Sequence, residues 1–222
     1  MGKKELLRRY IIFAFGLLFN SFGVAFVTKA SLGTSPISSI PYSLSLILTR
    51  LTMGNWTIFY SVLLTLLQWA ILKKNAKKAE LVLQMIVSVA FGYLIDFSMF
   101  LLQAVQPQVY IVKIVLLLIG CVIIAFGAYL EVVGDVVMLP GDAFVRAITK
   151  VTQKDYGVVR VISDVSMAVI AAILCLVFLH KLIGVREGTI IAALVVGTFV
   201  KVFSSRLKPL TAWLLAGLDT KN

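Results

Sequence analysis

The sequence is poor in the side chains on which most enzymes and metal sites depend. It contains one histidine and two cysteines among 222 residues. Cys121 and Cys175 lie inside apolar runs without neighbouring metal ligands, which is typical of small core residues. His180 stands at the end of an apolar run, and no phosphate-binding loop, zinc-ligand cluster or Ser-His-Asp arrangement can be found in the sequence. We therefore expect no enzymatic activity and no cofactor.

Charged residues are scarce as well. They make up 14% of the chain against 60% hydrophobic residues, and the mean hydropathy is +1.02. Soluble domains carry about a quarter charged residues, so this composition predicts an integral membrane protein. The net charge of +11 comes from Lys and Arg in short clusters between apolar runs. Such clusters are typical of topology signals beside an anionic cytoplasmic leaflet, and we expect no nucleic-acid partner.

Six apolar segments are long enough to cross a bilayer. The fourth has an apolar pattern longer than a bilayer is thick, so we expect it to tilt or project. Two shorter apolar segments begin with the turn sequences GTSP and LPGD. We expect each to be a re-entrant half-helix or an amphipathic helix at an interface. The spans are predicted at 10–28, 56–72, 82–105, 112–138, 158–180 and 188–205, and the short segments at 35–51 and 141–151.

The distribution of Lys and Arg predicts the orientation. If the N-terminus is cytoplasmic and neither short segment crosses, 16 of the 21 basic residues lie on the cytoplasmic side. Letting only the first short segment cross would move the cluster KKNAKK outside, which the positive-inside rule disfavours. The sequence therefore predicts a multi-pass protein with both termini in the cytoplasm.

An internal duplication is the most informative pattern in the chain. The sequence FG, followed by a polar residue and a glycine, occurs at Phe15 to Gly23 and again, 111 residues later, at Phe126 to Gly134. The turn LGTSPIS is matched by LPGDAF, and GYLIDF is matched by GTFVKVF. These matches pair Asn20 with Glu131, Pro36 with Pro140, Ser38 with Asp142 and Asp96 with Lys201.

Three spans per copy make the second copy run in the opposite direction through the membrane. The predicted fold is therefore an all-α membrane protein, with residues 1–222 as a single membrane domain. It consists of two inverted repeats, about 10–105 and 112–205, each with three spans and one short half-helix. Paired, interrupted hydrophobic segments are typical of secondary transporters, whose half-helices begin near the midplane.

The chain also resembles a known family. The sequence GLLFNSFGVAFVTKASLGTSPISS resembles the opening of the YczE/YyaS/YitT-type bacterial membrane proteins. The later sequence VVMLPGDAFVRAITKVTQKDYGVVRVISDV is similar to the YczE branch. The resemblance covers roughly residues 10–205 and implies a bacterial plasma-membrane protein with five or six spans. It implies little chemistry, because substrates of this family are not generally established. Other members often have Asp in the final G-x-x-x-D motif, where this chain has Lys201.

Polar residues inside apolar spans are the first candidates for a substrate site, because they are costly there. We expect Asn20 and Glu131 to face each other, either around a polar solute or, for Asn20, in a helix-packing hydrogen bond. Asp142 caps its helix beside Arg146, or this helix start and Arg146 bind an anionic group. The substrate-binding candidates are Asn20, Thr34, Ser35, Ser38, Glu131, Asp142 and Arg146.

A second group of residues is assigned to ion pairing or coupling. Asp96 is expected to pair with Lys201 or to take part in coupling, whereas Lys201 could instead extend to the cytoplasmic surface. Asp135 follows Glu131 by one helical turn and shares its face. Asp164 lies four residues after Arg160 on the same helix, and Arg146 is its alternative partner.

These patterns lead to one functional hypothesis with two alternatives. The first is a small secondary transporter, importing or exporting a small anionic or zwitterionic solute by alternating access. The second is an accessory or signalling membrane protein that supports a larger assembly. An ion channel is a third and weaker alternative. A homodimer is compatible with the size of the chain.

Overall fold

The computed structural model describes residues 3–73, 76–207 and 209–210, and these residues form helices and their connections. Six of the described helices are long and apolar enough to cross a membrane. They are α1 (Lys3–Lys29), α3 (Met53–Leu72), α4 (Lys78–Leu101), α5 (Tyr110–Gly134), α7 (Tyr156–Leu179) and α8 (Glu187–Arg206). Two short helices, α2 (Pro36–Ile47) and α6 (Pro140–Thr152), follow α1 and α5. The predicted class, an all-α multi-pass membrane protein, is confirmed.

Large apolar side chains cover the outside of the bundle. They would aggregate in water, but lipid tails are as apolar as these side chains. The outward-facing residues therefore suit a surface in contact with lipid. Among the exposed side chains are Phe59, Trp69, Tyr93, Phe100, Ile111, Phe178 and Leu194.

Two predicted helix ends are wrong. The fourth span was expected to reach residue 138, but α5 ends at Gly134. Asp135 takes a left-handed conformation with φ 48°, which stops the helix, and the next four residues are not helical. Pro140 then starts α6, a position where its fixed φ and missing N–H are tolerated. The third span similarly ends at Leu101 and not at residue 105.

Helices α1 and α5 pack antiparallel along a seam of glycines. Gly16 lies against Glu131, Gly127 against Asn20, and Gly23 against Ile124. A Cβ atom added to Gly127 would lie 2.5 Å from the backbone nitrogen of Asn20, so the two backbones are in direct contact. Small residues permit such close approach between membrane helices. The seam glycines, spaced seven residues apart on each helix, are Gly16 and Gly23 on α1 and Gly120, Gly127 and Gly134 on α5.

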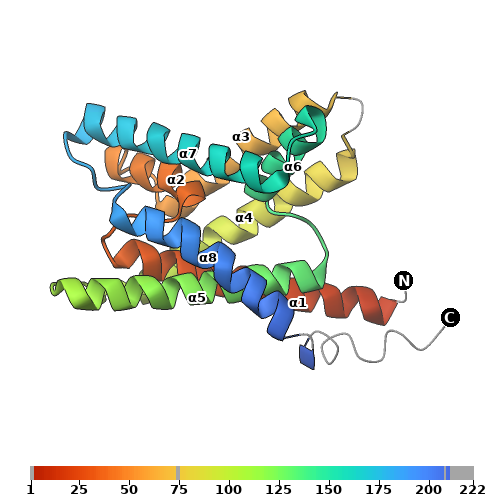
Figure 1. Cartoon of the computed structure of the whole chain (residues 1–222), viewed down its shortest axis with the longest axis horizontal. Coiled ribbons are helices and arrows are strands. Elements are labelled where there is room, and N and C mark those ends of the chain that lie inside the picture. Colours follow the sequence, from red (N-terminus) through yellow and green to blue (C-terminus); the bar gives the residue numbers. More distant parts are fainter. Residues whose placement is uncertain (1–2, 74–75, 208, 211–222) are drawn as a thin grey trace.

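The other helices pack in matching pairs in the two halves of the chain. Helix α1 packs on α4, and α5 packs on α8. Each short helix packs on a long helix of the opposite half, α2 on α7 and α6 on α3. Figure 1 shows α2 and α6 toward opposite ends of the bundle. These pairs are what a two-fold relation between the halves requires, and the antiparallel α1–α5 pair is what inverted halves require.

One pair breaks this correspondence. Helix α3 packs closely on α4, but the matching helices α7 and α8 have no comparable contact in the described structure. Figure 1 shows α8 running away from α7 and along α5 toward the end of the bundle where α1 begins. The two halves therefore differ at one helix interface.

The two short helices begin next to each other. The side chain of Ile37 in the first turn of α2 contacts Gly141 in the first turn of α6. Helix α2 buries Ser38, Ser39 and Ser43 among its neighbours, so it is packed within the bundle and does not lie flat on it. The N-terminal ends of the two short helices therefore meet within the bundle.

The glycine seam predicts the effect of adding one methyl group. Gly127→Ala should destabilise the protein by about 1–3 kcal/mol, because the new Cβ meets the backbone of α1. Gly197→Ala in α8 is the matched control, since nothing lies within 4 Å of its added Cβ. That change should be neutral or stabilising by up to about 1 kcal/mol. Unfolding of both purified variants in micelles measures the difference, and equal stabilities would contradict the seam.

Candidate functional site

A hydrogen bond crosses the glycine seam near the centre of the protein. The amide nitrogen Nδ2 of Asn20 donates to the Oε1 atom of Glu131 at 2.9 Å. Asn20 is 8% exposed and Glu131 is half-buried. The glycines opposite them, Gly127 and Gly16, bring the two helix backbones close enough for these short side chains to meet. The predicted meeting of Asn20 and Glu131 is therefore confirmed.

A three-residue ion-pair network joins α6 to α7. The guanidinium of Arg160 pairs with the carboxylate of Asp142 and also, at 3.1 Å, with that of Asp164. Asp142 stands in the first turn of α6, and Arg160 and Asp164 are one turn apart on α7. The predicted Arg160–Asp164 pair is confirmed, whereas Asp142 is bound to Arg160 and not to Arg146.

These two groups of residues lie close together. The Asp142 carboxylate is within electrostatic reach of Glu131, although they are on different helices. Tyr60 of α3 is within similar reach of Asp164. We call Asn20, Glu131, Asp142, Arg160 and Asp164 the central polar cluster. It contains three carboxylates and one guanidinium, beside the point where α2 and α6 begin.

The hydroxyl groups at the start of α2 form hydrogen bonds with other hydroxyl groups of the protein. Ser35 is the N-cap residue of α2, and its hydroxyl donates to the Oγ of Ser38 at 3.1 Å. Thr34 is fully buried, with its hydroxyl 3.4 Å from that of Thr28. Ser38 is buried and directly follows Ile37, which contacts α6. These residues thus lie at the start of α2 as predicted, and Ser38 is the one nearest to the α6 contact.

Two predicted site residues lie outside the cluster. The guanidinium of Arg146 is exposed and donates to the sulfur of Met138 at 3.1 Å. The α6 helix is amphipathic, and Arg146 is on its exposed face whereas Asp142 is directed to α7. Asp135 is the C-cap residue of α5, with 86% of its side chain exposed and Arg9 4.0 Å away. Neither residue has the surroundings of a buried solute ligand.

Asp96 has a different partner from the one expected. Its carboxylate accepts hydrogen bonds from the Thr52 hydroxyl at 2.6 Å and from the Gly54 amide at 2.8 Å. It therefore holds the N-terminus of α3, where free N–H groups favour an anion. Lys201 is exposed and forms no ion pair within the described part of the chain. The predicted Asp96–Lys201 pair is wrong, because the Asp96 carboxylate is bound at the start of α3 instead.

The glycine contact beside Asp96 is not formed at the matching positions of the second half. Gly54 and Gly92 are buried and touch each other where α3 packs on α4. The matching glycines, Gly157 of α7 and Gly197 of α8, are both exposed. An added Cβ on Gly157 would meet only Asp155, its own N-cap residue. The sequence thus repeats the glycine pair, but the structure uses it in one half only.

Arg160 is the member of the central polar cluster that sequence reasoning treated only as a local partner of Asp164. A guanidinium inside an apolar span is a signal in its own right, because such residues in membranes face the interior or a cavity. Its second partner, Asp142, comes from another helix and is not visible in the sequence spacing.

Fold and site together define a multi-pass helical membrane protein with a charged cluster where two half-helices begin. The chain belongs to the family of unknown function DUF6198, which matches residues 7–205. No curated protein and no solved structure matches the chain. The family supplies no activity, so the function has to be argued from the residues themselves.

The ion-pair network predicts unequal effects of removing two arginines. Arg160→Gln should destabilise the protein by about 1–3 kcal/mol, because Asp142 and Asp164 lose their shared cation. The partial exposure of the three side chains, 34%, 37% and 18%, places the effect below that of a fully buried pair. Arg146→Gln, on the exposed face of α6, should change stability by less than about 0.5 kcal/mol. Denaturant unfolding in micelles measures both, and a larger loss for Arg146→Gln would contradict this assignment.

Proposed function

We propose that the protein is a small secondary transporter that works by alternating access. The observation that carries this proposal is the unequal use of two equivalent helix interfaces. The glycine contact between α3 and α4 is closed, and the equivalent contact between α7 and α8 is open. A transporter built from two inverted halves changes its exposed side by exchanging the conformations of those halves.

The residues at the open interface fit together in the second state of this proposal. Thr52 and Asp155 are both N-cap residues, of α3 and α7, and Asp96 matches Lys201. In the closed interface, Thr52 donates to Asp96. Closing the other interface would bring the Asp155 carboxylate to the Lys201 ammonium, an attractive pair. In this structure the Asp155 carboxylate accepts hydrogen bonds from the backbone amides of Gly157 and Val158.

The charges of the central polar cluster favour a solute with a positive group. The cluster has three carboxylates and one guanidinium, and this guanidinium binds only the two aspartates. Glu131 has an amide as its partner and no cation among the described residues. Because Arg146 lies outside the cluster, an anion has no free cation there. Of the two solute types expected from the sequence, the cluster therefore favours the zwitterionic one, with its ammonium group near Glu131.

The remaining assignments rest on sequence patterns. We place the protein in the plasma membrane of a bacterium, in the YczE branch, on the resemblance of the two turn regions. The clusters of Lys and Arg support cytoplasmic termini. With that orientation, the closed α3–α4 contact lies toward the outside and the open α7–α8 contact toward the cytoplasm.

The proposed second state predicts a conditional cross-link. Thr52→Cys/Asp96→Cys should cross-link readily, because these side chains are in contact. Asp155→Cys/Lys201→Cys should cross-link only when α8 closes on α7. Once this cross-link has formed, the Thr52→Cys/Asp96→Cys pair in the same protein should cross-link more slowly, because the α3–α4 contact is open in that state. Both pairs are made with Cys121 and Cys175 replaced by alanine, and cross-linking is followed by gel mobility in membranes.

A matched pair controls for random collisions. Ile162 is exposed two helical turns further along α7, about 10 Å from the level of Asp155, so Ile162→Cys/Lys201→Cys should remain unlinked. If Asp155→Cys/Lys201→Cys reacts no faster than this control, the chain has no such second state, and alternating access in this form is excluded.

Transport itself is the direct test of the cluster. Proteoliposomes would be screened for uptake and efflux with a panel of radiolabelled amino acids and primary amines. Glu131→Gln should lower the rate by about tenfold or more, because the charge that meets the solute is lost. Asp142→Asn should lower it similarly, because Arg160 loses a carboxylate that fixes α6 against α7 beside the cluster. Asp135→Asn, at an exposed helix end, should leave the rate unchanged.

Two outcomes would count against the proposal. Unaltered transport in both cluster variants would remove Glu131 and Asp142 from the mechanism. If no solute of the panel is transported and a partner protein copurifies instead, the accessory role becomes the better explanation.

A further inference from the structure

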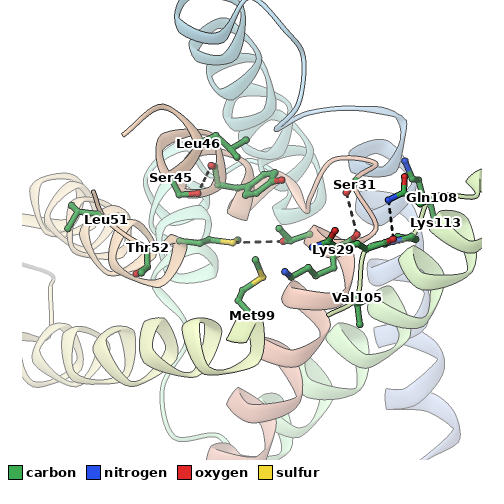
Figure 2. A pocket seen from close by; sticks show the side chains of 15 residues that line it. Lys29, Ser31, Ser45, Leu46, Leu51, Thr52, Met99, Val105, Gln108 and Lys113 are labelled. Carbon is green, nitrogen blue, oxygen red and sulfur yellow. Dashed lines mark hydrogen bonds between the residues drawn. The ribbon is translucent and has the colours of Figure 1, made fainter. Parts of the chain in front are cut away.

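A separate polar cavity lies at the end of the bundle where α1 and α4 end and α3 and α5 begin. It has a volume of about 630 Å³, within the range of about 300–1,000 Å³ that is usual for small-molecule sites. Figure 2 shows its walls, which come from these four helices, from α2 and from the α4–α5 connection. By the distribution of basic residues, this is the outer end of the protein.

The cavity is positively charged. Lys29 at the end of α1 and Lys113 near the start of α5 both line it, and no carboxylate is among its lining residues. Neither ammonium group has an ion-pair partner in the described part of the chain. Figure 2 shows the Lys29 side chain extending from the end of α1 toward Met99.

The surrounding groups suit an anion as well. The wall includes the hydroxyl groups of Thr28, Ser31 and Ser45, and two glutamine amides lie nearby at Gln106 and Gln108. The three hydroxyls donate to the backbone carbonyls of Val24, Lys29 and Tyr42. The glutamine amides therefore remain as the neutral donors for carboxylate or phosphate oxygens.

One carboxylate that contacts a lining residue is already bound elsewhere. It belongs to Asp96, which accepts hydrogen bonds from Thr52, itself a lining residue, and from the Gly54 amide. Its negative charge is thus directed to the start of α3.

The placement of the two lysines is unusual for a membrane protein. Only 5 of the 21 Lys and Arg residues fall on the predicted outer side, and two of those five line this one cavity. Topology signals favour basic residues on the cytoplasmic side, so they do not account for this pair. A lysine at a helix end can be explained by the helix dipole, which applies to Lys29 but not to Lys113 at the start of α5.

We propose that this outer cavity binds an oxyanion group, a carboxylate or a phosphate, between Lys29 and Lys113. Two ammonium groups and the nearby glutamine amides supply charge and hydrogen bonds, and the volume admits a small metabolite. The group belongs either to a soluble solute or to the headgroup of an anionic lipid. As a step in transport, the idea rests on the proposed function: a zwitterion is held here by its anionic end before its ammonium group reaches Glu131.

Anion binding can be measured without any transport. The full chain is placed in nanodiscs of phosphatidylcholine, and binding of sodium phosphate and sodium succinate is measured by calorimetry at constant ionic strength. Lys29→Gln and Lys113→Gln should each weaken binding by about tenfold, because one charge-assisted contact is lost. Lys181→Gln, a basic residue on the predicted outer side but away from the cavity, is the matched control and should bind as the unmodified protein does. The conservative Lys29→Arg and Lys113→Arg variants should restore binding and show that the fold is intact.

The arms of the experiment separate the two sources of the anion. Binding of phosphate or succinate that both Gln variants weaken supports a solute site. If neither anion binds, but phosphatidylglycerol nanodiscs raise the thermal stability of the unmodified protein and not of the two Gln variants, the same site holds a lipid headgroup. If neither anion nor the lipid has an effect, or if Lys181→Gln weakens binding equally, the inference is overturned. The Asp155–Lys201 cross-link is independent of these results, so either idea can fail alone.

Discussion

The direct backbone contact between α1 and α5 is the constraint on which the other helices depend. Glycines on both helices bring the backbones together, so any side chain larger than hydrogen at Gly16 or Gly127 would separate them. Because the two helices are held at this distance, Asn20 and Glu131 can reach each other across the seam. Helix α4 then packs on α1 and α8 packs on α5. Each short helix packs on a long helix of the opposite half.

A symmetric scaffold of this kind can have two arrangements of similar free energy. Gly54 and Gly92 are in contact, whereas Gly157 and Gly197 are exposed although they occupy matching positions. Closing the second pair while opening the first would exchange one glycine contact for another. The net change in free energy is therefore expected to be small. Two states separated by a few kcal/mol are what a solute needs in order to shift a population.

The sequence predicts which helices form and which of them pack together better than it predicts where each helix ends. Composition and periodic apolar runs indicate six spans, and the recurrence of Gly16 as Gly127 indicates the partner of α1. The end of α5 could not be predicted, because the apolar run continues past Asp135 to Leu139 and only the left-handed backbone of Asp135 stops the helix. The partner of Asp142 was also missed. Arg146 is nearer in the sequence, but α6 directs its acidic residue toward Arg160 of the next helix.

The arrangement of charges gives the residues of the central polar cluster different roles. Arg160 is held between Asp142 and Asp164, which fixes α6 against α7 and uses the one cation of the cluster. Glu131 is bound instead by the neutral amide of Asn20, at the seam and within electrostatic reach of Asp142 in the first turn of α6. Its charge is therefore the one that the described protein groups leave uncompensated, and an uncompensated carboxylate in an apolar environment attracts a proton or a cation. In the proposed transport mechanism, Glu131, and not the ion-paired aspartates, is therefore the residue at which a positively charged group or a proton would enter.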